Sequence, residues 1–248
     1  MSKVVLITGA SRGIGRAAAR LAGRRGWSVG VNYAGDAEAA RASVAEVEAA
    51  GGRALAIQGD VSVEAEVIAM FDAAQDAFGP LDGFVNNAGV LGPSMPLAEM
   101  DADRMRRIFD VNVLGAYLCA REAARRLSRN RGGRGGTIVN VSSAAARLGS
   151  PSEYVDYAGS KGAIDTLTIG LAKELGPEGV RVNAIRPGLI ETDIHASGGR
   201  PDRAATLGAT TPIGRAGTAE EVAEAIVWLL DDASSYVTGA LLDVAGGR

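Results

Sequence analysis

Short apolar segments alternate with helix-forming segments along the whole of this 248-residue chain. "VVLIT" near the start and "GTIVNVSS" in the middle are short, apolar and β-branched, which is typical of strands buried on both faces. The segments between such strands are alanine-rich or amphipathic, and several stop at glycine, as helices do. Because strands and helices in this rhythm form parallel βαβ units, we predict one domain over residues 1–248. Its expected fold is α/β, a doubly wound parallel sheet of about seven strands with helices on both faces.

The composition excludes several classes of function. Charged residues make up 22% of the chain and the net charge is −3, which gives no reason to expect a nucleic-acid partner. No apolar run reaches membrane-spanning length, and the apolar run at the start is too short for a signal peptide. Cys119 is the single cysteine, so no intrachain disulfide can form, which favours a reducing compartment. We therefore expect a soluble, cytoplasmic protein with no membrane partner.

Glycine is the compositional anomaly, at 34 residues, and it gathers in functional places such as "TGASRGIG", Thr8 to Gly15. This loop follows the first predicted strand and opens the first predicted helix, whose N-terminus presents free N–H groups and a partial positive charge. Gly9, Gly13 and Gly15 remove the Cβ atoms that would keep a ligand from the backbone. The spacing G-x-x-x-G-x-G is a variant of the dinucleotide fingerprint. The loop therefore predicts a Rossmann-type nucleotide site.

The end of the second predicted strand indicates which dinucleotide is bound. An acidic side chain there binds the ribose 2′-hydroxyl of NAD, whereas neutral or basic surroundings admit the 2′-phosphate of NADP. Asn32 and Tyr33 stand at that place, and Asp36 comes late enough to be the N-cap of the next helix. Arg12 in the glycine loop can bond a phosphate. The sequence favours NADP, with NAD as the alternative.

Further motifs follow in a fixed order along the chain. They are Asp60-Val61 after the third strand, "NNAG" from Asn86, Asn112 in a predicted helix from Asp101 to about Asn130, "VSS" ending at Ser143, Tyr157 with Lys161, and "RPG" at Arg186. With the glycine loop, this set resembles the short-chain dehydrogenase/reductase family from Val4 to Gly247. Within the family, the chain looks most like the single-domain type that includes 3-oxoacyl-carrier-protein reductases and sugar-alcohol dehydrogenases.

The resemblance implies a role for each matching position. The implied catalytic set is Asn112, Ser143, Tyr157 and Lys161. The implied cofactor contacts, together with those of the glycine loop and the second strand, are Gly9, Ser11, Arg12, Gly13, Ile14, Gly15, Asn32, Tyr33, Asp60, Val61, Asn87, Ala88, Gly89, Tyr157, Lys161, Pro187, Gly188, Ile190 and Thr192. It also implies a homotetramer and a small-molecule or acyl-linked carbonyl substrate.

The chemistry of ketone reduction is consistent with this catalytic set. Negative charge builds on the ketone oxygen and needs a proton donor within hydrogen-bond reach, which the Tyr157 hydroxyl can supply. A free phenol has a pKa of about 10, and a lysine cation at i+4 is expected to lower it. Ser143 can donate to the developing oxyanion, and Asn112 can hold a water that relays protons to Lys161. The predicted activity is NADP(H)-preferring interconversion of a ketone and a secondary alcohol.

Several competing residues are weaker candidates. Tyr154 lacks a lysine four residues on, and Ser142 points to the opposite face of its strand from Ser143. The interval from Ser143 to Tyr157 is one residue longer than the resemblance implies, so "GSPSEYVD" is expected to alter the substrate pocket. His195 is the only histidine, and a Ser-His-Asp hydrolase would have to use it. No His or Cys cluster has metal-ligand spacing, so no metal is expected.

Two segments break the strand–helix rhythm. Glu191 to Thr211 is small, polar and too long for a routine loop, and we interpret it as a substrate lid. An arginine cluster contains Arg125, Arg126, Arg129, Arg131 and Arg134. It is either a solvated helix end or a docking patch for an acidic carrier protein, and the second interpretation goes with the alternative function of 3-oxoacyl thioester reductase. A third hypothesis, a cofactor-binding sensor without turnover, does not need the catalytic set.

Overall fold

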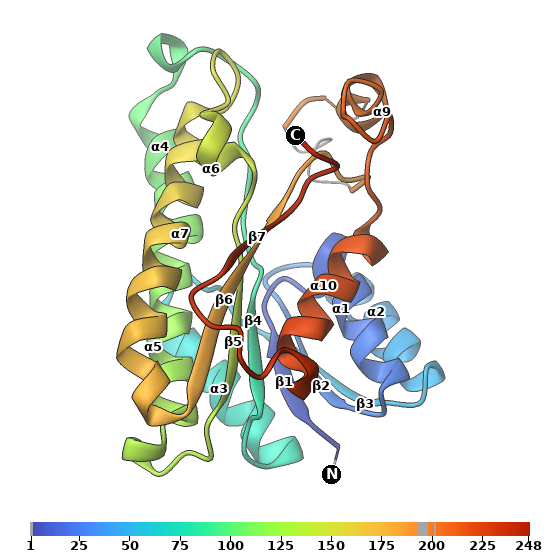
Figure 1. Cartoon of the computed structure of the whole chain (residues 1–248), viewed down its shortest axis with the longest axis vertical. Coiled ribbons are helices and arrows are strands. Elements are labelled where there is room, and N and C mark those ends of the chain that lie inside the picture. The colour runs from blue at the N-terminus through green and yellow to red at the C-terminus, as the bar shows by residue number, and fades with distance from the viewer. Residues whose placement is uncertain (1, 193–197, 201) are drawn as a thin grey trace.

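The computed structural model describes residues 2–192, 198–200 and 202–248, apart from the side chain of residue 205. Its strands form one parallel sheet in the order β3-β2-β1-β4-β5-β6-β7 (Figure 1). They are β1 (Val4–Ile7), β2 (Ser28–Tyr33), β3 (Arg53–Gln58), β4 (Gly83–Asn86), β5 (Gly136–Val141), β6 (Val180–Pro187) and β7 (Leu241–Val244). The predicted fold class is confirmed. The strand order reverses between β1 and β4, and ligands of such sheets bind beyond the carboxyl ends of the strands at that point.

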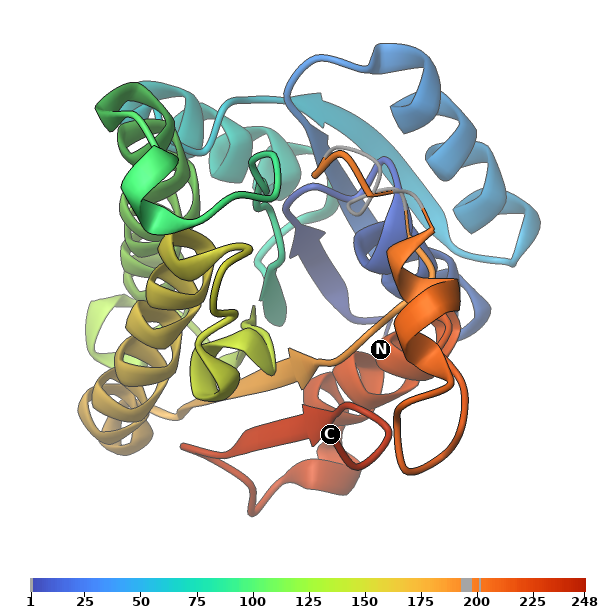
Figure 2. The same cartoon turned by 90° about the horizontal axis from the view of Figure 1, so that it is seen from above.

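Helices cover both faces of the sheet (Figures 1 and 2). They are α1 (Gly13–Arg24), α2 (Ala37–Ala49), α3 (Glu64–Phe78), α4 (Ala102–Phe109), α5 (Ala116–Leu127), α6 (Ala145–Leu148), α7 (Val155–Leu175), α9 (Arg203–Gly208) and α10 (Ala219–Leu230), with single 3₁₀ turns at Leu97–Glu99, Arg129–Arg131, Gly176–Glu178 and Asp232–Ser234. α1, α2 and α10 lie on one face, and α3, α5 and α7 on the other. None of the described helices is long and apolar enough to cross a bilayer.

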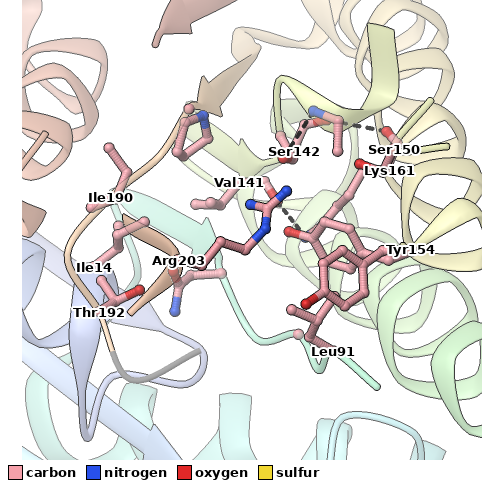
Figure 3. Close-up of a pocket in the computed structure, with 17 residues that line it drawn as sticks. Ile14, Leu91, Val141, Ser142, Ser150, Tyr154, Lys161, Ile190, Thr192 and Arg203 are labelled. Carbon is pink, nitrogen blue, oxygen red and sulfur yellow. Dashed lines mark hydrogen bonds between the residues drawn. The ribbon is translucent and has the colours of Figure 1, made fainter. Parts of the chain in front are cut away.

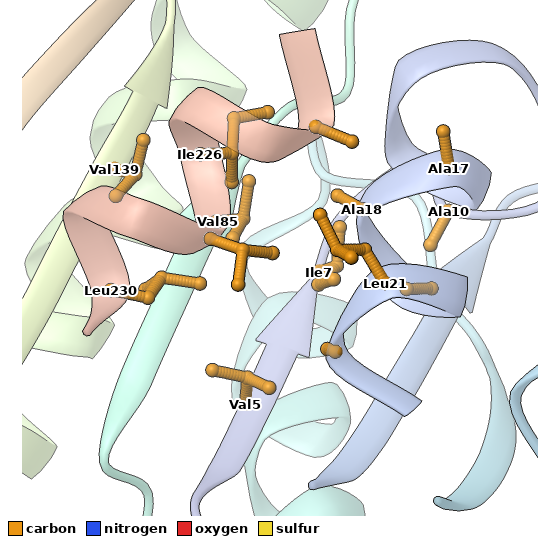
Figure 4. Close-up of a cluster of buried hydrophobic side chains, with 14 of the residues drawn as sticks. Val5, Ile7, Ala10, Ala17, Ala18, Leu21, Val85, Val139, Ile226 and Leu230 are labelled. Atoms are coloured by element: carbon orange, nitrogen blue, oxygen red, sulfur yellow. The ribbon is translucent and has the colours of Figure 1, made fainter. Parts of the chain in front are cut away.

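Alternate residues of each central strand supply the two halves of the core. In β1, Val5 and Ile7 pack toward α1 and α10, whereas Val4 and Leu6 pack toward α3 and α5. Figure 4 shows the first of these clusters, in which Ile226 of α10 meets the strand side chains. Successive strand residues point to opposite faces, so a strand covered on both sides is apolar throughout. This explains why "VVLI" shows no polar alternation.

The predicted helical region from Asp101 to about Asn130 is confirmed over residues 102–127. α4 passes into a π-helical segment over Asp110–Gly115, and α5 follows it and ends at Leu127. Asn112 lies within the π-helical segment and is 1% exposed. A π turn inserts a residue into the i→i−4 ladder and is frequent at functional sites. The sequence did not predict this local change of helix type at Asn112.

Candidate active site

The glycine loop has the shape that close approach to its backbone requires. Gly9 and Gly13 have φ angles of +62° and +55°, which L side chains rarely adopt. A Cβ on Gly15 would lie 2.5 Å from the backbone oxygen of Gly9 and 2.6 Å from Nδ2 of Asn87. That Nδ2 donates to the carbonyls of Thr8 and Gly9 at 2.8 and 3.1 Å. Because α1 begins at Gly13, its first N–H groups face this loop. The residues present fit the pyrophosphate of a dinucleotide.

The side chain of Asn32, at the end of β2, is hydrogen-bonded to neighbouring backbone groups, and its predicted contact with the cofactor stays a prediction. The residue is 1% exposed. Its Nδ2 donates to the carbonyls of Ile57 and Gly59 at 3.3 and 3.0 Å, and its Oδ1 accepts from the N–H of Gly9 at 3.2 Å. The side chain thus ties the glycine loop to β3. Tyr33, the next residue, is half-buried and projects from the other side of the strand.

The charged residues beside this strand end lie as the sequence predicts. Asp36 is the N-cap of α2, and its Oδ1 accepts from the N–H of Ala39 at 2.9 Å, so the predicted cap is confirmed. Arg12 is exposed directly before α1. The end of β2 itself therefore carries an amide and a phenol rather than a carboxylate, while a cation stands at the start of α1.

The remaining predicted cofactor residues are held by local contacts, and several of them line one pocket. Asp60 Oδ1 accepts from the N–H and hydroxyl of Ser62 at 2.9 and 2.7 Å, and buried Val61 packs against Gly115. Ser11 is buried within the glycine loop, and the N–H of Ala88 donates to Thr8 Oγ1 at 3.0 Å. A single pocket is lined by Ile14, Asn87, Gly89, Pro187, Gly188, Ile190 and Thr192 together with Ser143, Tyr157 and Lys161. The structure thus brings predicted cofactor and catalytic residues together.

This pocket has two different sides, which Figure 3 shows. Ile14 and Thr192 lie on one side, and Tyr154 and Lys161 lie on the other. The side chain of Arg203, from α9, extends between them with its guanidinium toward the middle of the pocket. The first side comes from the predicted cofactor residues, and the second comes from α7 and the turn before it.

Tyr157 and Lys161 stand one helical turn apart near the start of α7. Lys161 is 4% exposed, its Nζ lies 5.6 Å from the centroid of the Tyr157 ring, and it donates to the carbonyl of Val141 at 2.8 Å. Ser143 follows β5, and its Oγ accepts from the N–H of Ala145 at 3.1 Å. The hydroxyl of Ser142 donates instead to the carbonyl of Lys161 at 3.1 Å, at 2% exposure. Both serines line the pocket, but the hydroxyl of Ser142 is already bonded to the backbone of α7.

Burial dominates the titration of this pair. It raises the pKa of Tyr157 above that of an ordinary phenol, while a hydrogen bond with Ser143 and the positive charge of Arg203 act in the lowering direction. Desolvation lowers the pKa of Lys161 to about 8, and the charge of Asp165 opposes that change. The predicted net lowering of the Tyr157 pKa is therefore wrong for the protein alone, because the loss of water around the phenolate outweighs the hydrogen bond and the positive charge that act in the lowering direction.

The side-chain amide of Asn112 is hydrogen-bonded to other groups of the protein. Its Oδ1 accepts from the N–H of Val90 at 2.8 Å, and its Nδ2 donates to the Val90 carbonyl at 2.9 Å and to Ser160 Oγ at 3.2 Å. A Cβ on Gly89 would lie 3.3 Å from Asn112 Oδ1 and 3.5 Å from Lys161 Nζ. Asn112 therefore holds the segment at Gly89 and Val90 beside Lys161, and its predicted water relay stays a prediction.

Two buried ion pairs that sequence reasoning missed support α7. Arg104 of α4 donates from Nε to Asp156 Oδ2 at 2.9 Å, and Asp156 Oδ1 accepts from the N–H of Tyr157 at 2.8 Å. Arg186 of β6 donates from Nη2 to Asp165 Oδ2 at 2.7 Å. The spacing offered a signal for Asp165, because it follows Lys161 by four residues, as Lys161 follows Tyr157. Nothing local marked Arg104.

The turn before α7 and the described part of the predicted lid meet across the pocket. Glu153 Oε1 accepts from Arg200 Nη1 at 2.8 Å, and its Oε2 accepts from Arg203 Nη2 at 2.6 Å. Tyr154 is 2% exposed, and its hydroxyl donates to the carbonyl of Gly198 at 3.4 Å. The predicted lid, Glu191 to Thr211, also contains residues 193–197 and 201. These, with His195 of the hydrolase alternative, lie outside the described residues.

Comparison with known proteins identifies the family. A family model described as "Enoyl-(Acyl carrier protein) reductase" matches residues 9–248. The chain is 51% identical over 245 residues to the uncharacterised oxidoreductase YgfF of Escherichia coli (strain K12), covering 99% of each chain. The chain belongs to the short-chain dehydrogenase/reductase family. As a member of this family it is an oxidoreductase that acts on alcohols or ketones.

Solved structures of the family share its architecture. Levodione reductase is similar with a TM-score of 0.92 at 33% identity, over 99% of this chain and 96% of that one. The 3-ketoacyl-(acyl-carrier-protein) reductase from Brucella melitensis, complexed with NADH, is similar with a TM-score of 0.91 at 34% identity, over 99% and 98% of the two chains. The glycine loop and the pocket beside it thus belong to an NAD(P)-binding fold.

The arginine cluster is largely engaged within the chain. Arg126 pairs with Asp72 and Glu122 at 2.8 Å each, Arg125 pairs with Glu122 at 3.3 Å, and Arg134 pairs with Asp82 at 3.2 Å. Arg129 donates from Nε to the carbonyl of Arg134 at 3.3 Å. Most arginines of the cluster are therefore bonded to other groups of the same chain.

Proposed function

We propose that this protein is an NADP(H)-preferring reductase that interconverts a ketone and a secondary alcohol, with Tyr157 as its general acid and base. The observation that carries the proposal is the shared pocket: Tyr157, Lys161 and Ser143 face the cavity that Ile14 and Thr192 of the cofactor side also line. A sensor would need the glycine loop alone. A phenol, a lysine and a serine converging on one cavity are what ketone reduction needs.

Each residue then has one task in the reduction. The nicotinamide cofactor, held by the glycine loop and by Pro187, Gly188 and Thr192, supplies the two-electron chemistry when bound. Ser143 donates a hydrogen bond to the ketone oxygen as negative charge builds there. Tyr157 gives its hydroxyl proton to that oxygen, and the Lys161 ammonium stabilises the phenolate that remains. In alcohol oxidation the same phenolate takes the proton back.

The preference for NADP follows from the charges around the ribose position. The carboxamide of Asn32 points inward, Asp36 is engaged as a helix cap, and Arg12 is exposed at the start of α1. A 2′-phosphate therefore meets a cation and no carboxylate at the strand end. NAD is the alternative, and a comparison of kcat/KM with NADPH and NADH on one ketone decides between them.

The catalytic assignment predicts that Tyr157→Phe retains cofactor binding but loses turnover by about 10²–10⁴-fold or more, since positioned proton transfer contributes that much. Tyr154→Phe is the matched control, because Tyr154 lines the same pocket but has no lysine one turn on. A panel of ketones and 3-oxoacyl thioesters with NADPH measures kcat, and quenching of tryptophan fluorescence measures cofactor binding. Normal turnover by the Tyr157→Phe variant would end the proposed mechanism.

The thioester reductase is a second candidate because the structural likeness extends to a 3-ketoacyl-(acyl-carrier-protein) reductase. In that case the arginine cluster would dock the acidic carrier, although most of it is internally paired. Replacing Arg129 and Arg131 by Ala then selectively lowers activity on carrier-linked substrate. Unchanged activity on that substrate removes this candidate and leaves the small-ketone reductase.

The proposed assembly is a homotetramer. Phe109, Leu114, Tyr117 and Ile169 are all at least 40% exposed, on α4, α5, α7 and the π-helical segment between α4 and α5. Exposed apolar side chains on adjacent helices are typical of a subunit contact. Light scattering coupled to gel filtration gives the mass of the assembly.

A further inference from the structure

The pocket contains a cation that the proposed mechanism does not use. Arg203 lines the cavity with Tyr157 and Lys161, and its side chain is only 11% exposed. Its guanidinium lies 5.4 Å from the centroid of the Tyr154 ring. A guanidinium with so little water must be compensated by neighbouring groups, and each of its N–H groups needs an acceptor.

The compensation of Arg203 within the protein is incomplete. Its Nη2 donates to Glu153 at 2.6 Å, but Glu153 also accepts from Arg200 at 2.8 Å, so one carboxylate faces two guanidinium groups. The Nε of Arg203 is buried and has no hydrogen-bond partner in the described part of the chain. An unmade hydrogen bond at a buried charged group is costly and rare in native proteins.

Two residues of the turn before α7 hold Arg203 in place. Glu153 and Tyr154 come from the turn before α7, in which Ser150 and Ser152 adopt φ angles of +44° and +61°. This turn includes the segment that is one residue longer than the family resemblance implies. Glu153 fixes one end of the guanidinium through Nη2, the Tyr154 ring lies against its face, and the guanidinium extends toward the middle of the pocket. This arrangement fixes the orientation of a positively charged hydrogen-bond donor, the Arg203 guanidinium.

We propose that Arg203 binds an anionic group, a carboxylate, carried by the substrate on the side of the molecule away from the reacting carbon. This inference rests on the proposed function, because it names the class of ketone that the reductase takes: a keto acid and its hydroxy acid. The carboxylate accepts from N–H groups on the pocket side of the Arg203 guanidinium, and it neutralises the net positive charge that remains where two arginines face the one carboxylate of Glu153. Charge-assisted bonds to arginine select an acid over a neutral analogue of the same shape.

A matched pair of substrates tests the proposal. 4-Oxocyclohexanecarboxylate and its carboxamide have the same ring and ketone but differ in charge. The wild-type enzyme should reduce the acid with a kcat/KM about 10–100-fold higher than that of the amide, the ratio that a charged hydrogen bond of about 1.5–3 kcal/mol gives. In Arg203→Met the ratio should fall to about one, chiefly through a higher KM for the acid. The ratio for Arg203→Lys, which keeps the positive charge but not the planar set of N–H donors, should lie between these two values.

Two controls separate the possible causes. Arg200→Met leaves Arg203 and its bond to Glu153 in place, so the acid should still be preferred. An equal loss of preference in both variants would show general attraction of anions and overturn the proposal. The affinity for NADPH should be unchanged in Arg203→Met, and a loss there as large as the loss for the acid would assign Arg203 to the cofactor instead.

A binding measurement keeps the inference distinct from the proposed function. Cyclohexanecarboxylate has no ketone, and calorimetry with the NADPH-loaded protein measures its binding without turnover, against cyclohexanecarboxamide as the neutral probe. Preferential binding of the acid that disappears in Arg203→Met supports the inference even if no ketone in the panel is reduced. Reduction of neutral ketones with no preference for the acid in either assay overturns the inference and leaves the reductase.

Discussion

The two walls of the pocket are held in different ways. On the cofactor side, short amide side chains and glycine backbone are in direct contact, with Asn87 and Asn32 both bonded to the glycine loop. On the substrate side, long side chains reach across open space, with Glu153 joined to two arginines and Arg203 lying beside Tyr154. At Gly15 the first wall leaves no room for a methyl group, whereas the second wall is formed by the ends of a few side chains. A cofactor shared by a family suits the first kind, and a variable substrate suits the second.

In the comparison of the two walls, the largest expected effect comes from adding one methyl group to the cofactor wall. In Gly15→Ala the new Cβ meets the backbone oxygen of Gly9 at 2.5 Å, and the loop must shift because backbone cannot swing aside. Overpacking of this kind costs about 1–3 kcal/mol, and the NADPH dissociation constant should rise about 10–100-fold, measured by fluorescence titration. Gly170→Ala in α7 is the control, since a Cβ there meets nothing within 4 Å. It should instead raise the free energy of unfolding by about 0.5–1 kcal/mol. An unchanged affinity in Gly15→Ala would mean that this wall is as adaptable as the other.

The difference between the walls also explains what the sequence could predict. The sheet, the glycine loop and the Asp36 cap follow from local patterns of apolar period, glycine position and helix start, and all three are present. The inward turn of Asn32 was not predictable from its place in the strand, because it depends on the carbonyls of Ile57 and Gly59 on a neighbouring segment. Arg104 and Arg203 find their partners 52 and 50 residues away. No local pattern encodes contacts made by long side chains over such separations.

The two walls meet at α7, where the titration of Lys161 provides a second test. Its pKa is lowered to about 8, so above that pH the folded protein loses the ammonium that stabilises the phenolate in the proposed mechanism. The kcat for ketone reduction should therefore fall above about pH 8, approaching about tenfold per pH unit. Asp165 raises the pKa of Lys161, so Asp165→Asn should move the fall to lower pH.

The control for that pH profile is Asp243→Asn. Asp243 also faces Arg186, at 3.9 Å, but its charge is not among the causes of the Lys161 shift. Its profile should match that of the wild type. Stability provides an independent measure. Between about pH 8 and 10.5 the unfolded chain binds more protons at Lys161 than the folded one, so the cost of burying this group fades and the free energy of unfolding rises with pH. A kcat that stays level to pH 10 would contradict the role of the ammonium.

The smallest expected effect concerns backbone strain. The two walls differ in the residue types that adopt left-handed backbone conformations. The left-handed positions of the cofactor loop, Gly9 and Gly13, are glycines, whereas the turn of the substrate wall has serines at φ +44° and +61°. A left-handed conformation costs a residue with a Cβ about 1–2 kcal/mol, and glycine loses about 0.5–1 kcal/mol to its freer unfolded chain. Ser152→Gly should therefore raise the free energy of unfolding by up to about 1 kcal/mol, measured by urea denaturation. Gly149→Ala, at φ +76° with nothing within 4 Å of its Cβ, should lower it by a similar amount, so the two opposite signs isolate the backbone term. If the Ser152→Gly variant is more stable but no longer discriminates among ketones, the strained turn is what holds Glu153 and Arg203 in position. If the variant is less stable, the turn is not strained, and the two walls differ in their side chains alone.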